Sequence, residues 1–242
     1  MGALARVSAL FLCVWIAACA TAPSVPFDKS SANIHSIAIV GLQVPQYPVA
    51  YQAATAGESM AAAGGLIGAL IGAAIDASVQ SNREGKLKKM IDAKGYNAQE
   101  AFKTTLTLAL NNQGYAVTVM EAGREKPGEY LTRYPAKPDG IDAFLDISEV
   151  SQGFMQPAAG APWRPMVWVR CRLVSADKHD VLMESTIEYN AVRSIKGVVT
   201  VAPTAEYSFK DVDAIVADPD KAFAALNDAF AVTASTIGTL LQ

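Results

Sequence analysis

The residues that most often carry out chemistry in proteins are scarce in this chain of 242 residues, which contains two histidines and three cysteines. The sequence lacks the short motifs typical of zinc proteases, serine hydrolases, redox dithiols and phosphate-binding loops. His35 lies on an expected strand and His179 at an expected turn, positions that are structural or exposed more often than catalytic. Cys171 alternates with apolar residues, so we expect a buried, unreactive thiol. The sequence therefore predicts no catalytic residues, no metal site and no cofactor.

Two groups of charged residues nevertheless have the composition of ligand sites. The first consists of Asp211, Asp213, Asp218 and Asp220. This spacing lacks the glycine and the terminal glutamate of a calcium-binding loop, so we interpret these aspartates as helix caps. The second group lies on one side of a predicted hairpin and consists of Arg170, Arg172, Glu184 and Glu188. It fits either cross-strand ion pairs or a patch that faces a ligand.

Cys19 has the most distinctive sequence context of the three cysteines. A single early charge, Arg6, precedes an uncharged apolar run over 7–18, which is typical of a secretory signal. The run is shorter than the roughly 20 apolar residues that a membrane span needs. It ends in Ile-Ala-Ala-Cys at 16–19, which resembles the lipobox of bacterial lipoproteins.

That resemblance implies that residues 1–18 are a signal peptide and that the Cys19 thiol is acylated once the signal has been removed. Two or more acyl chains on one residue anchor a protein stably in a bilayer. Residues 19–32 would then be the lipidated cysteine and a tether. Residue 20 is alanine and not the aspartate that often retains such proteins in the inner membrane, so the periplasmic face of the outer membrane is expected. The alternative is ordinary secretory cleavage, with Cys19 coincidental.

The segment over 59–82 is unusually rich in small residues. Gly64, Gly68 and Gly72 recur every four residues and share one face of a predicted helix. Glycine in a helix interior costs about 1 kcal/mol relative to alanine, so close packing must offset three of them. The pattern resembles the glycine zippers of envelope lipoproteins and pore-forming segments. We consider three roles for it: insertion in or on a membrane, an oligomer interface, and packing within the same domain.

Five basic residues follow this segment at 83, 86, 88, 89 and 94, with apolar residues interleaved. This run fits either contact with anionic lipid headgroups or an amphipathic helix whose basic face is solvated.

Hydrophobic patterns predict a strand over 34–41, a helix that begins at Asn97 and a second strand over 115–120. Asn97 and Glu100 are typical of a capped helix start, and Gly114 suits its left-handed end. A strand–helix–strand unit implies a right-handed crossover and a parallel strand pair. Loops are expected over 42–57, 122–140 and 152–165.

Further strands are expected over 142–150, 166–174 and 181–189, and a terminal helix from about Asp218. The last two strands read as a hairpin whose apolar residues face the core when Glu184 lies opposite either Arg170 or Arg172. The fold class is therefore α/β: one sandwich of two or three layers over 33–242, with a mixed sheet, an apolar glycine-zipper helix and a C-terminal helix. This order of elements resembles the small α/β domains of periplasmic lipoproteins of the curli-assembly type.

Three large apolar residues lie in or near the expected loop over 152–165: Phe154, Met155 and Trp163. They are candidates for contact with a partner protein, and the alternative is that they fold back onto the core.

The composition excludes two further classes of protein. A chain that is 51% hydrophobic with a net charge of −3 is neither disordered nor suited to nucleic acid. We expect a non-catalytic envelope lipoprotein that acts in assembly, export or envelope maintenance. Its partners would be membrane lipid through Cys19 and either a second copy or another envelope protein. The alternatives are a periplasmic ligand-binding module and an enzyme with an unrecognised site.

Overall fold

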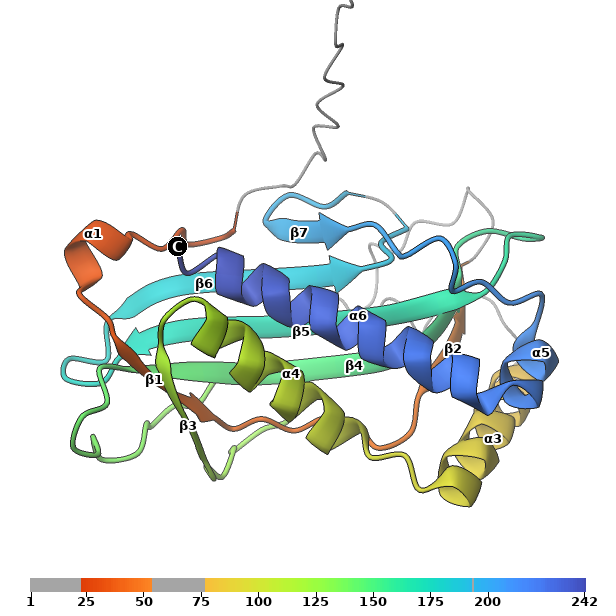
Figure 1. Cartoon of the computed structure of the whole chain (residues 1–242), viewed down its shortest axis with the longest axis horizontal. Coiled ribbons are helices and arrows are strands. Elements are labelled where there is room, and N and C mark those ends of the chain that lie inside the picture. The colour runs from red at the N-terminus through yellow and green to blue at the C-terminus, as the bar shows by residue number, and fades with distance from the viewer. Residues whose placement is uncertain (1–22, 54–76, 193) are drawn as a thin grey trace, which may run out of the picture.

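A computed structural model describes residues 23–53, 77–192 and 194–242, and shows an α/β fold with a mixed sheet (Figure 1). Its strands are β1 (Ser36–Val40), β2 (Val49–Gln52), β3 (Ala116–Met120), β4 (Ala143–Gln156), β5 (Arg164–Ser175), β6 (Val181–Tyr189) and β7 (Val198–Val201). Its helices are α1 (Lys29–Ala32), α3 (Ala77–Lys94), α4 (Ala98–Asn112), α5 (Val212–Ala217) and α6 (Pro219–Thr239).

The sheet has the strand order β3-β1-β4-β5-β6-β7, and β2 also pairs with β4. β1 is parallel to both β3 and β4, which confirms the predicted parallel pair across α4 and the central position of the first strand. β4, β5 and β6 form an antiparallel meander. In this hairpin Arg172 lies opposite Glu184, the second of the two registers that the apolar pattern allows.

Two of the predicted loops contain strand. β2 forms within the loop expected over 42–57, and β4 continues to Gln156 although a loop was expected from 152. β1 and β2 lie one after the other along β4, because β1 pairs with its first residues and β2 with its last. Gly153 indicated a loop in the sequence. In the structure its lack of a side chain allows the backbone of β2 to approach β4. A β-carbon at Gly153 would lie 2.1 Å from the Val49 carbonyl oxygen.

We expect Gly153→Ala to separate β2 from β4 and to lower the free energy of unfolding by about 2–4 kcal/mol, because backbone atoms on both sides must move. Chemical denaturation of the purified domain measures this loss, and amide hydrogen exchange of residues 49–52 should rise. Gly140→Ala is a control for a left-handed glycine, since a β-carbon there meets nothing within 4 Å. An equal loss in both variants would contradict the role given to close approach.

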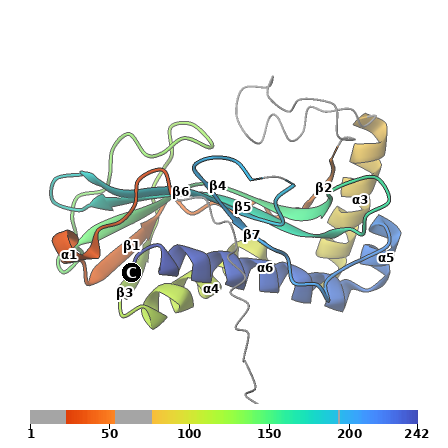
Figure 2. The same ribbon diagram turned by 90° about the horizontal axis from the view of Figure 1, so that it is seen from above.

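Helices α4 and α6 cover one face of the sheet, as the edge-on view in Figure 2 shows. The core between them contains Phe102 and Leu106 of α4 and Phe230 and Ile237 of α6, all buried against the apolar side chains of β1, β4 and β5. The Phe102 and Phe230 rings lie 5.2 Å apart. The predicted C-terminal helix is therefore confirmed, together with its packing face.

Capping confirms the predicted helix starts. The Asn97 side chain accepts a hydrogen bond from the Glu100 N–H at 3.0 Å, and Gly114 has the expected left-handed backbone, with φ of 88°. Asp211 and Asp218 cap α5 and α6 by accepting from the N–H groups three residues ahead. Two of the four aspartates are thus helix caps, and no group of three metal-ligating side chains occurs in the described parts of the chain.

A second core lies where α3 and α5 meet the ends of β2 and β4. Leu87, Met90 and Ile91 of α3 are buried while Lys88 and Lys89 are exposed, so the basic run lies on a helix that packs its apolar residues against the domain. None of the described helices is long and apolar enough to cross a membrane. Gly64, Gly68 and Gly72 lie outside the described residues, as does the zipper segment up to residue 76.

Candidate functional site

The face of the sheet opposite α4 and α6 carries the main group of buried and half-buried charges. The connection from β3 to β4, residues 121–142, lies over part of this face (Figure 2). Asp146 of β4, Arg170 and Arg172 of β5 and Glu184 of β6 point toward it, because their alternate neighbours pack against the helices. Three of the four residues of the predicted group, Arg170, Arg172 and Glu184, therefore lie on one surface with Arg124 and Tyr130 of the connection. The fourth, Glu188, is buried farther along β6, opposite Trp168 of β5.

Tyr130 holds the two arginines of β5. The Arg172 guanidinium lies 3.9 Å from the centre of the Tyr130 ring and donates to Glu184 at 2.7 and 2.9 Å. Arg170 lies 5.1 Å from the same ring and donates to the Gly128 carbonyl oxygen at 3.0 Å. Planar guanidinium groups stack on aromatic rings and still donate in their own plane. Each arginine thus joins the connection to the sheet.

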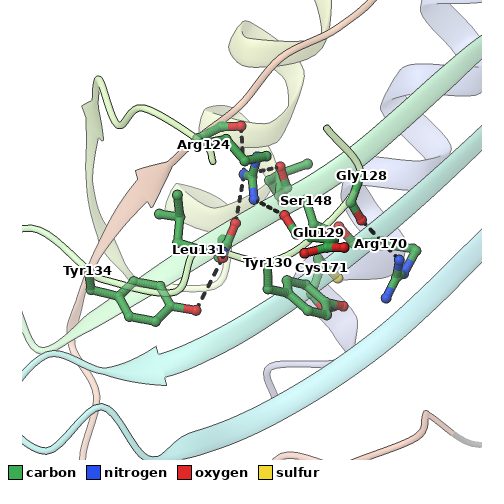
Figure 3. A network of polar contacts seen from close by, with 12 residues as sticks. Arg124, Gly128, Glu129, Tyr130, Leu131, Tyr134, Ser148, Arg170 and Cys171 are labelled. Carbon is green, nitrogen blue, oxygen red and sulfur yellow. Dashed lines mark hydrogen bonds and ion pairs between the residues drawn. The ribbon is translucent and has the colours of Figure 1, made fainter. Parts of the chain in front are cut away.

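Arg124 and Asp146 form a buried ion pair at the centre of the network (Figure 3). The Arg124 nitrogen atom lies 2.8 Å from Oδ1 of Asp146, and the two side chains are 3% and 0% exposed. Arg124 also donates to the carbonyl oxygens of Gly41 at 2.9 Å, Ile147 at 2.8 Å and Glu129 at 2.5 Å. The guanidinium therefore connects the end of β1, strand β4 and the connection itself.

The second carboxylate oxygen of Asp146 fastens the next part of the connection. It accepts from the Leu131 N–H at 2.8 Å and from the Tyr134 hydroxyl at 3.1 Å. Burial raises the pKa of Tyr134, and the negative charge of Asp146 raises it further. Burial likewise raises the pKa of Tyr130. Both phenols stay protonated at neutral pH and act as hydrogen-bond donors to the sheet.

Of the carboxylates in this network, Glu149 has the properties that most resemble those of a catalytic acid or base. Burial raises the pKa of its carboxyl, and Arg170, 3.9 Å away, offsets this only in part. Glu149 follows a bulge in β4, where the register with β5 shifts after Ile147. A raised carboxyl pKa at a bulge is a feature of some active sites. Here the neighbouring charges are those that hold the connection on the sheet, so the geometry supports a structural clamp.

Asp142 ties the start of β1 to the start of β4. Its carboxylate accepts at 2.9 Å from the N–H groups of His35 and Ser36 and from the Ser36 hydroxyl. Partial burial opposes ionisation, but these hydrogen bonds outweigh it and hold the pKa of Asp142 below its ordinary value. A lowered native pKa stabilises the fold above the unfolded value of about 3.9, and this contribution disappears as pH falls through the native pKa.

We expect Asp142→Asn to destabilise the domain at pH 7 and to have a much smaller effect once the pH has fallen below the lowered native pKa of Asp142, where the wild-type carboxyl is also protonated. Urea denaturation of both proteins across this pH range measures the difference. Asp139→Asn removes an exposed carboxylate from the same connection and serves as the control. A pH-independent loss in the Asp142 variant would show that the hydrogen bonds, and not the charge, carry the effect.

The candidate partner-contact residues lie in the core. Phe154 and Met155 belong to β4 and are fully buried, and Trp163 directly precedes β5 and is 3% exposed. The ring of Phe154 meets that of Phe209 edge-on at 5.6 Å, and Trp163 pairs with Phe209 through two backbone hydrogen bonds. The expectation of an exposed contact loop is therefore corrected, because these side chains fold back onto the core.

Cys171 is buried, whereas both histidines are exposed. Cys171 is buried on the helix-covered face of β5, and burial raises the pKa of its thiol to about 12. His35 contacts Asn33 at 3.2 Å, and the His179 ring lies 5.6 Å from that of Tyr134.

An open cleft of about 540 Å³ lies between α3 and α5. Arg83, Lys86, Asp211 and Asp213 contribute its charged side chains. The Lys86 ammonium lies 2.5 Å from Asp213, and Arg83 donates to Gln52 at 3.0 Å and lies over the Trp163 ring. Two basic residues of the predicted run thus meet acidic and aromatic groups of their own domain.

The network centred on Arg124 was not predicted from the sequence. Its signal is Asp146, an acid inside the apolar run Ala-Phe-Leu-Asp-Ile at 143–147. A carboxylate at a buried strand position requires a cationic partner or several donors. The candidate lipid-attachment residue Cys19 lies outside the described residues.

No known protein family model matches this sequence. No curated protein matches it significantly either.

Proposed function

We propose that the protein is a non-catalytic lipoprotein of the bacterial cell envelope, anchored in the outer membrane through acylated Cys19 and facing the periplasm. The observation that carries the proposal is the sequence Ile-Ala-Ala-Cys at 16–19 at the end of a signal-like apolar run. The arrangement of the folded domain agrees with it. The charges of the described network are engaged in fastening the connection over 121–142 to the sheet.

The role that we propose is envelope assembly, export or maintenance. The segment over 59–82 with Gly64, Gly68 and Gly72 would supply the second contact, as an apolar helix. Three uses of it remain in competition: insertion in or on the membrane, packing against a second copy or another envelope protein, and packing on its own domain. Gly68→Leu separates them, because only the first two predict a change in membrane partition or in oligomeric mass.

Intact mass spectrometry of the protein extracted in detergent from its native host tests the anchor. We expect a mature N-terminus at Cys19 that carries the mass of two or three acyl chains. A mature chain that begins at another residue, or an unmodified Cys19, would overturn the proposal. The same measurement under native conditions gives the number of copies per particle.

A periplasmic ligand-binding module is the second candidate. The cleft between α3 and α5 favours it, because a volume of about 540 Å³ is in the range of small-molecule sites. Its test is thermal denaturation with a panel of small charged metabolites. A rise in the melting temperature that Lys86→Ala abolishes would favour this function over the first.

A further inference from the structure

The N-terminal segment already contacts the folded domain at Val25, inside the range 19–32 that was expected to be a flexible tether. Val25 forms an antiparallel bridge to Glu184 of β6, with both backbone hydrogen bonds at 3.0 Å. Phe27 and Ala32, the last residue of α1, pack against the main core. The chain between Cys19 and the domain is therefore only the part that precedes Val25.

This short connection limits how far the domain can move from an anchor at Cys19. About six residues separate Cys19 from Val25, and an extended chain spans at most about 3.6 Å per residue, so the reach is roughly 20 Å. The sheet is wider than this. Its order from β3 to β7 contains five strand spacings of ~4.8 Å each, or ~24 Å.

The point of attachment lies on one particular edge. Val25 extends the outer side of β6 next to β7, and Ser24 lies near Gly197, where a β-carbon would be 3.9 Å from its hydroxyl oxygen. We name this edge the tether edge: residues 24–26, the outer side of β6, β7 and the described residues 190–192 and 194–197. It forms the upper rim in Figure 1, whereas the end of β3 and α3 lie on the lower rim.

The tether edge also carries exposed apolar side chains. Three of the large apolar residues that are exposed in the described parts of the chain lie on it: Val25, Val181 and Val192. The charges near them are mixed, since Lys178, Asp180 and Lys196 are all exposed. Contact of this edge with lipid headgroups would therefore depend on the anchor and on apolar contact, not on attraction to anionic lipid.

We propose that the protein presents the tether edge to the bilayer surface and directs the end of β3, α3 and the cleft between α3 and α5 toward the periplasm. This inference rests on the proposed acylation of Cys19, and it excludes insertion of the segment over 59–76 in the membrane, because α3 follows that segment directly in the chain. It assigns the lipid headgroup layer as the occupant of the tether edge, because the anchored chain keeps this edge within roughly 20 Å of the acyl chains. It also leaves the opposite edge as the surface available to other envelope components.

Energy transfer from labelled positions to the membrane tests this orientation. The full mature lipidated protein is placed in vesicles of phosphatidylethanolamine and phosphatidylglycerol that contain an acceptor on the lipid headgroup. The donor is attached at Val192→Cys on the tether edge or at Val119→Cys on β3, which is 44% exposed. Cys171 does not compete for the label, because it is buried and the pKa of its thiol is raised.

We expect about threefold stronger transfer from position 192 than from position 119, since β3 is ~24 Å farther across the sheet. Salt at 0.5 M should leave the ratio unchanged. A matched variant with about twelve Gly and Ser residues inserted after Ala20 should bring the two signals together, because its reach exceeds the width of the sheet.

Equal transfer from the two positions in vesicle-bound protein would overturn the orientation and leave the anchor standing. Vesicle association that persists in Cys19→Ala would show a membrane contact other than the lipid and would overturn the tether-edge proposal. An unmodified Cys19 in the mature protein would overturn the lipid anchor itself.

Discussion

Asp146→Ala is expected to lower the free energy of unfolding by about 3–5 kcal/mol, a large part of the roughly 5–15 kcal/mol that stabilises a typical domain. The substitution leaves the Arg124 guanidinium charged, 3% exposed and without its carboxylate. It also removes the acceptor of the Leu131 N–H and of the Tyr134 hydroxyl. Each buried donor that loses its acceptor adds a desolvation cost of about 1–3 kcal/mol. The connection over 121–142 should detach from the sheet.

Denaturant titration gives the stability loss, and amide hydrogen exchange shows whether it is centred on residues 124–134. The matched control is Asp177→Ala, which removes a carboxylate 2.8 Å from Lys137 in a pair that is 36% and 68% exposed. Exposed pairs contribute at most about 1 kcal/mol, so the control should unfold nearly as wild type does.

A second comparison separates the charge from the shape of the site. The double variant Arg124→Met with Asp146→Leu removes both charges and should be more stable than Asp146→Ala alone, because no unpaired charge remains buried. If the double variant is the less stable of the two, the stabilisation comes from the four contacts of Arg124 and not from neutralisation of a buried charge.

Cys19→Ala is expected to abolish acyl labelling completely and to move the protein out of the membrane fraction, or to leave an uncut precursor. The thiol is the acceptor of the diacylglyceryl group in the lipoproteins that this N-terminus resembles, and alanine offers no nucleophile. Labelling with a fatty-acid analogue in a bacterial host, followed by fractionation, measures both effects.

Cys13→Ala provides the matched control, because residue 13 lies inside the apolar run and would leave with the proposed signal peptide. This variant should be processed, labelled and sorted like the wild type. Label that remains in Cys19→Ala would place the acylated residue elsewhere. Loss of label in both variants would indicate a defect in export and not in acylation.

Sequence patterns predicted the elements that have strong local signals. Asn97 and Asp218 cap the helices that they were expected to begin, and the apolar stripe of α6 packs against the sheet. The continuous apolar run of β1 indicated a central strand next to a parallel neighbour, since both of its faces must be covered, and the structure gives it two parallel neighbours. In each case the residues that define the element lie next to one another in the chain.

The elements that were missed are short and depend on distant partners. β2 and β7 have four residues each and are parallel to strands that lie far along the chain or across a connection. A stretch of that length carries no detectable periodicity. Gly153 reads as a loop signal until Val49 is known to approach it, and the long β4 follows from that contact.

The polar network was only partly accessible from the sequence. The hairpin pattern brought Glu184 opposite one of two arginines, and both alternatives placed these charges on one face. The role of Arg124 could not be predicted from the sequence, because it lies in a connection with no regular structure. Its partners, Gly41 at the end of β1 and Asp146 of β4, are many residues away in the chain. The glycine- and proline-rich surroundings of Phe154 and Trp163 left open whether these side chains contact a partner or fold back onto the core. The extension of β4 buries Phe154, and Trp163 is buried where it pairs with Phe209.

The pairing of β1 has a consequence for the way in which the chain acquires its structure. β1 is the first strand to be synthesised, yet its two neighbours are β3 at 116–120 and β4 from 143. The meander β4–β5–β6 needs only its own consecutive residues, and local pairings close faster than distant ones. The N-terminal strand therefore has no partner in the described sheet until the chain has grown through β3, and its second neighbour follows only with β4.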